Sequence, residues 1–123
     1  MPTFKRIEDI QAWQKARQAT RMIYELTGNG MFAKDFGLRN QIQRAVVSIM
    51  ANMADGFGRR SDKEFANFLN MAHGSVSETQ SHLYVALDLG YIDQTSFTKV
   101  YDLLDEVSRM TLTLAQHLRG SQL

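Results

Sequence analysis

The chain has 123 residues, the length of one domain, and its 44% apolar and 22% charged residues are typical of a globular protein. It has no cysteine, which excludes disulfides, thiolate metal sites and cysteine nucleophiles. The net charge of +1 is unevenly spread: residues 1–60 hold ten Lys and Arg against five Asp and Glu, whereas residues 61–123 hold four against eight.

The first two periodic segments predict helices over residues 8–27 and 36–56. In the first segment, apolar side chains recur in steps of three and four: Ile10, Trp13, Ala16, Thr20, Ile23 and Leu26. Residues 28–34 between the helices are expected to form a loop, with Met31 and Phe32 packed against the bundle. Asp35 is the predicted N-cap of the second helix. Apolar side chains cover more of that helix than one core-facing stripe, so part of its surface is a candidate contact with another subunit.

The third helix has the clearest start signal in the chain. The run from Ser61 to Glu64 matches a capping box, and Gly90 is expected to end the helix. Gly74 lies in its middle, where a glycine indicates close backbone approach. The fourth helix is predicted over 95–119 by a seven-residue repeat of Phe97, Val100, Leu104, Val107, Thr111, Leu114 and Leu118.

Four amphipathic helices with short connections, and no segment of alternating polarity, predict an all-α protein. We expect an antiparallel up-down-up-down four-helix bundle formed by residues 1–123 as a single domain. No stretch approaches the roughly 18 apolar residues of a membrane span, and the N-terminus has no signal-peptide pattern. A cytoplasmic protein that does not contact a membrane is therefore expected.

Side chains with catalytic or ligating potential do not form a recognisable active site. His73, His82 and His117 are not spaced three or four apart, so no two of them share a helix face as a ligand pair. No serine lies on a strained turn with a base and an acid in reach. We expect no metal site, no cofactor and no enzymatic activity.

Ser48, Asn52 and Asp55 form a polar strip on the otherwise apolar second helix. We interpret this strip as a buried hydrogen-bond network that holds the helix in register. The alternative is that the three side chains bind a ligand or take part in catalysis.

Arg59, Arg60 and Lys63 lie around the turn that precedes the third helix. A helix N-terminus and nearby guanidinium groups can together bind phosphate, so these three residues are candidate contacts to nucleic acid. Arg39 and Arg44 are the next candidates. The alternative is an ordinary solvated surface, because Asp62 and Glu64 beside the turn repel anions.

The run from Gln41 to Gly56 resembles the pattern Q-x-x-R-A-x-x-S-I-P-A-N-I-A-E-G of the four-helix bundle family encoded in intervening sequences of 23S ribosomal RNA genes. It departs from that pattern at Met50, Met53 and Asp55. The chain is similar also to the accessory subunits of diversity-generating retroelements. The resemblance implies a helical subunit that assembles into a homopentamer, and the retroelement relatives bind nucleic acid and a reverse transcriptase.

These observations favour a non-enzymatic homo-oligomeric scaffold that binds RNA or DNA weakly through its basic half. The alternative is a protein-interaction module that binds a protein partner and has no role with nucleic acid.

Overall fold

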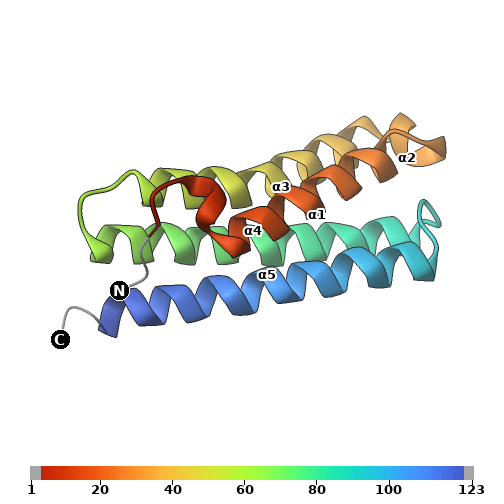
Figure 1. Cartoon of the computed structure of the whole chain (residues 1–123). Coiled ribbons are helices and arrows are strands. Elements are labelled where there is room, and N and C mark those ends of the chain that lie inside the picture. Colours follow the sequence, from red (N-terminus) through yellow and green to blue (C-terminus); the bar gives the residue numbers. More distant parts are fainter. Residues whose placement is uncertain (1–3, 121–123) are drawn as a thin grey trace.

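The computed structural model describes residues 4–120, and Figure 1 shows four long helices lying side by side. These are α1 (Gln11–Thr27), α3 (Phe36–Phe57), α4 (Asp62–Asp88) and α5 (Gln94–Gly120). A 3-10 turn, η1 (Ile7–Asp9), precedes α1, and the short helix α2 (Gly30–Lys34) lies at one end of the bundle. Successive long helices run in opposite directions and residues 4–120 contain no strand, so the predicted four-helix bundle is confirmed.

The long helices pack in a cyclic order. Helix α1 contacts α3 and α5, and α4 contacts the same two helices from the other side. The basic first half of the chain therefore contributes one side of the bundle, made by α1 and α3, and the second half contributes the opposite side, made by α4 and α5. Within residues 4–120, no helix has the length and apolar content needed to cross a membrane.

Side chains cap the starts of α3 and α4 at the predicted residues, although within residues 4–120 the Glu64 side chain does not make the reciprocal bond of the predicted capping box. The Asp35 carboxylate accepts a hydrogen bond from the Leu38 N–H at 3.1 Å, and the Ser61 hydroxyl accepts one from the Glu64 N–H at 3.1 Å. Each bond satisfies a backbone donor that has no partner within the helix. Both caps are local in sequence, which explains why the pattern located them correctly.

Helix α4 ends at a Schellman motif. Gly90 has a φ of 75°, its N–H donates to the Leu87 carbonyl at 3.0 Å, and the Tyr91 N–H donates to the Ala86 carbonyl at 2.9 Å. A left-handed backbone conformation of this kind favours glycine. The chain can therefore reverse after α4 and enter α5.

The core stripe of α1 differs from the predicted one. Its buried side chains are Ala12, Ala16, Ala19, Ile23 and Thr27, whereas Trp13 and Leu26 are half-buried at the margins. Alanines let neighbouring helices approach closely, so the stripe is centred on small residues and the large side chains cover its edges. The repeat in α5 is better predicted, although Ala115 is buried in place of the half-buried Leu114.

The segment predicted as a loop contains α2. Of the two side chains predicted to pack against the bundle, Phe32 does so and Met31 does not. Phe32 is fully buried and its ring lies 5.4 Å from that of Tyr91, measured between centroids. Met31, by contrast, is 62% exposed. Successive side chains of an α-helix point about 100° apart, so Met31 faces away from the core when Phe32 faces it.

No close approach occurs at Gly74 within residues 4–120, because a Cβ added there would meet no atom within 4 Å apart from the backbone of its own helix. The close approach occurs instead at Gly56, near the end of α3. A Cβ at Gly56 would lie 2.7 Å from the Phe68 Cβ and 2.9 Å from the Phe65 Cδ1. Gly56 therefore lets the end of α3 pack closely against the start of α4.

Candidate nucleic-acid interface

We call Arg59, Arg60 and Lys63 the turn cations, because they surround the connection between α3 and α4. All three side chains are exposed. The Arg59 guanidinium lies over the ring of Phe68, 4.6 Å from its centroid, an arrangement that orients the group while leaving N–H donors for a ligand. A hollow of about 160 Å³ beside the turn is lined in part by Phe57, Arg59 and Arg60.

The first turn of α4 is a weaker anion site than its position alone implies. The Ser61 hydroxyl already occupies the Glu64 N–H, and Asp62 and Glu64 place two carboxylates in that turn. The helix dipole favours these carboxylates as much as a bound phosphate. The attraction of this region for anions therefore comes from the arginine side chains rather than from free backbone groups.

Arg39 and Arg44 lie well away from the turn cations. Helix α3 has 22 residues and is about 30 Å long, with Arg39 in its first turns and Arg59 beyond its end. Arg39 is half-buried, donates to the Ala33 carbonyl at 2.9 Å and stacks 4.8 Å above the Phe36 ring, so its main role is to hold α2 against α3. Arg44 is exposed. The predicted candidates thus form no single cluster.

Arg44 borders a second hollow, of about 330 Å³, between α1 and α3. Its lining residues, which we call the α1–α3 groove, are Tyr24, Asn40, Gln43, Arg44 and Val47. The Gln43 amide donates to the Thr27 hydroxyl at 2.9 Å, which fixes its carbonyl oxygen relative to the groove. Among residues 4–120, no carboxylate lines this hollow.

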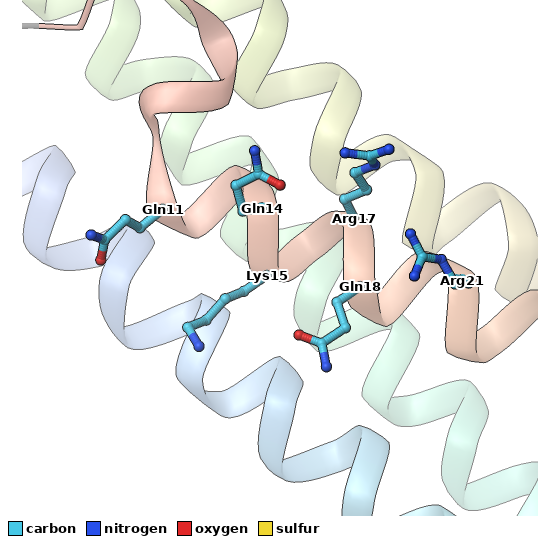
Figure 2. Close-up of a pocket in the computed structure, with 6 residues that line it drawn as sticks. All are labelled: Gln11, Gln14, Lys15, Arg17, Gln18 and Arg21. Carbon is cyan, nitrogen blue, oxygen red and sulfur yellow. The ribbon is translucent and has the colours of Figure 1, made fainter.

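Three further cations on α1 were not among the predicted candidates. Figure 2 shows Lys15, Arg17 and Arg21 with three glutamines on the outer face of α1, around a hollow of about 480 Å³. Lys15 pairs with Glu106 of α5 at 3.0 Å, whereas Arg17 and Arg21 are exposed and make no hydrogen bond or ion pair with the rest of residues 4–120. The signal that could have identified them is the absence of any Asp or Glu from residues 10–24.

The polar strip on α3 is only partly a network. The Ser48 and Ser75 hydroxyls lie 2.7 Å apart and join α3 to α4, and the Asn52 amide donates to the Ser48 carbonyl at 2.9 Å. Asp55 is exposed, and its side chain makes no hydrogen bond within residues 4–120. The prediction that Asp55 belongs to a buried network is therefore wrong. A carboxylate without a partner is far less costly in water than in the interior.

The histidines lie apart from one another. His73 Nδ1 is 2.7 Å from the Ser108 hydroxyl, and His82 Nε2 is 3.3 Å from a Glu78 carboxylate oxygen. Within the part of the chain that the structure describes, no three His, Asp or Glu side chains come together as metal ligands would.

Comparison with known proteins gives a family and a fold. Residues 8–113 match the family described as 23S rRNA-intervening sequence protein. The structure is similar to the crystal structure of a protein of unknown function from the S23 ribosomal protein family of Bacteroides thetaiotaomicron, with a TM-score of 0.76 and 24% identity over 85% of this chain and 97% of that chain. At this identity the likeness concerns the fold. No curated protein matches the sequence.

Proposed function

We propose that this chain, which belongs to the 23S rRNA-intervening sequence protein family, is a non-enzymatic helical scaffold that self-associates and binds the phosphate backbone of RNA or DNA. The binding surface comprises the turn cations together with the side of the bundle formed by α1 and α3. Phosphate contacts of this kind position a protein on nucleic acid without reading its sequence, so the binding is weak and non-specific.

The observation that carries the proposal is an excess of cations on the side of the bundle formed by α1 and α3, although Lys15 pairs with Glu106 of α5. Residues 10–24 hold three Lys and Arg and residues 36–54 hold two, and neither segment contains an Asp or Glu. Because α1 and α3 are neighbours, these segments share one side of the bundle. Arg17, Arg21 and Arg44 make no ion pair within residues 4–120. A surface with a local excess of positive charge attracts a polyanion.

Self-association would multiply these contacts. Met71, Gly74 and Val85 lie along one exposed stripe of α4, and Met71 and Val85 are 55% and 43% exposed. Gly74 costs this helix about 1 kcal/mol relative to alanine, and no neighbouring element within residues 4–120 lies close enough to require it. Both features favour a second copy packing against this stripe. A pentamer is the assembly that the resemblance implies, and a ring would repeat every basic surface in each subunit.

The test is a fluorescence anisotropy titration with labelled RNA and DNA over a range of salt concentrations. The wild-type protein should bind both, and affinity should fall with salt because phosphate contacts release counterions. In Arg59→Glu/Arg60→Glu the affinity should drop several-fold, and the slope of log affinity against log salt should become shallower by about one for each lost contact.

The control is Lys99→Glu/Arg109→Glu, which makes the same change in net charge at two exposed positions of α5. This variant should bind almost as the wild type does. If the intact wild-type assembly binds neither RNA nor DNA at low salt, the proposal is wrong and a protein-interaction module becomes the better reading. An equal loss of affinity in both variants would show that binding depends on net charge and not on the position of the turn cations.

A further inference from the structure

The outer face of α1 places an exposed aromatic ring in line with two unpaired arginines. Arg17, Arg21 and Tyr24 follow at steps of four and three, which brings them onto one stripe of the helix. Both arginines are exposed, and Tyr24 is 46% exposed. Figure 2 shows the Arg17 and Arg21 side chains extending on the side of α3, whereas Lys15 and Gln18 extend on the side of α5.

This stripe continues into the α1–α3 groove. Tyr24 borders the groove from α1, and Asn40, Gln43 and Arg44 border it from α3. The ring makes none of the aromatic contacts found elsewhere in the bundle, such as those joining Tyr84 to Phe97 and Tyr101. An exposed, unstacked ring therefore lies beside a hollow with amide and guanidinium groups and no carboxylate.

This combination of groups matches the chemistry of a single-stranded polynucleotide. Arginines bind phosphates, an aromatic ring provides a platform on which a base can stack, and amides can hydrogen-bond to base edges. A duplex keeps the faces of its bases stacked inside, so it could use the arginines but not the ring. The approximate 6 Å rise from Arg17 to Arg21 along the helix sets two cations beside consecutive stretches of a bound backbone.

We infer that the α1–α3 groove binds single-stranded nucleic acid, with a base stacked on Tyr24 and the flanking phosphates held by Arg17, Arg21 and Arg44. This inference rests on the proposed function and goes further, because it names the strand form that is bound and a surface distinct from the turn cations. It also predicts that the protein prefers single strands to a duplex, a preference that phosphate contacts alone would not produce.

The first test compares Tyr24→Leu with Tyr24→Phe, using oligouridine, oligodeoxythymidine and a duplex of equal length as probes in anisotropy titrations. Tyr24→Leu should weaken single-strand binding about 5- to 150-fold, the loss expected for one stacked base. Tyr24→Phe keeps the ring and should bind as the wild type does. Duplex binding should be the same in all three proteins. Equal melting temperatures and assembly masses would show that the variants are folded.

The second test compares Arg17→Glu/Arg21→Glu with Lys99→Glu/Arg109→Glu at matched salt. The α1 variant should lose most single-strand binding, and the α5 variant should lose little. Polyglutamate should compete poorly, because it supplies charge but no bases.

Several results would overturn the inference. If Tyr24→Leu and Arg17→Glu/Arg21→Glu bind single strands as the wild type does while Arg59→Glu/Arg60→Glu does not, the groove is the wrong surface and the proposed function stands. A wild-type preference for duplex, or competition by polyglutamate as effective as that by unlabelled oligouridine of equal charge, would contradict base stacking in the groove. No binding of any probe by the wild type would remove the proposed function as well.

Discussion

At Gly56 a single hydrogen atom in place of a side chain decides how closely two helices pack. The residue is buried, and the Cβ and ring of the two phenylalanines opposite lie where an alanine methyl would be. Glycine weakens a helix by about 1 kcal/mol relative to alanine. This cost is offset here because the close approach of α3 to α4 buries Phe65 and supports the Phe57–Phe65 ring contact, with centroids 6.3 Å apart.

We predict that Gly56→Ala lowers the free energy of unfolding by about 1–3 kcal/mol, the usual cost of an overpacked core. The matched control is Gly37→Ala in the same helix, where a Cβ would meet only the Asp35 side chain at 3.8 Å. It should be neutral or stabilise the protein by up to about 1 kcal/mol. Urea unfolding followed by circular dichroism measures both. A Gly56→Ala protein as stable as Gly37→Ala would show that α3 and α4 separate easily.

Among the elements, the start of α3 is tied to the loop between α4 and α5. One oxygen of the Asp35 carboxylate caps the helix by accepting from the Leu38 N–H, and the other accepts from the Tyr91 hydroxyl at 2.8 Å. The Leu38 bond, and then the Tyr91 bond, hold the pKa of Asp35 below its usual 3.8. The same bond to the carboxylate, helped by burial, raises the pKa of Tyr91 above 10.0. One side chain thus joins a helix end to a distant loop.

We predict that Asp35→Asn makes the protein less sensitive to acid. A lowered carboxyl pKa in the folded state means that the ionised form favours folding, so the contribution is present above pH 3.8 and is lost as the pH falls through the lower, folded pKa. The difference in stability between wild type and Asp35→Asn, measured by urea unfolding, should therefore be largest at neutral pH and shrink below pH 3.8.

The comparison variant for this acid effect is Tyr91→Phe, which removes one of the two bonds and should show a smaller pH dependence than the wild type. A wild-type and Asp35→Asn difference that stays constant from neutral to acid pH would contradict the role of the ionised carboxylate. Because asparagine is also a good N-cap, the substitution should leave α3 intact.

At the scale of the whole molecule, the distribution of exposed side chains indicates which faces are available for self-association and for binding a polyanion. The carboxylate-free segments lie on α1 and α3, whereas exposed Met71 and Val85 lie on α4. A copy that packs against the α4 stripe would leave the α1 side of the bundle open to solvent. Self-association and binding of a polyanion can therefore coexist in one assembly.

We predict that the wild-type protein self-associates and that Met71→Arg disrupts the assembly, because the stripe would then have to bury an unpaired charge. Light scattering should report several times the 14.0 kDa subunit mass for the wild type and a lower mass for the variant. Ser77→Arg is the control, since it adds the same charge to another exposed position of α4 and should leave the mass unchanged. A monomeric wild type would end the scaffold proposal.

The sequence by itself determined the helices, their caps and the class of fold. Apolar spacing and cap residues such as Asp35 and Ser61 act over a few residues, so the pattern contains the information that places them. The grouping of the turn cations around one connection could be predicted for the same reason, because they lie within five residues of the chain. Even the unpredicted α2 differs from the expected loop only by one short helix that buries Phe32.

Only the tertiary structure decided which side chains meet. Asp55 follows Asn52 by three residues yet is exposed, and Ser48 has its partner in Ser75, 27 residues away. Gly56, not Gly74, is the point of close approach, because that depends on the phenylalanines of the neighbouring helix. The α1–α3 groove likewise exists only because Tyr24 and Arg44, on separate helices, are brought to one hollow. Periodicity along a helix specifies which face is apolar, but the packing of helices determines what lies opposite each residue.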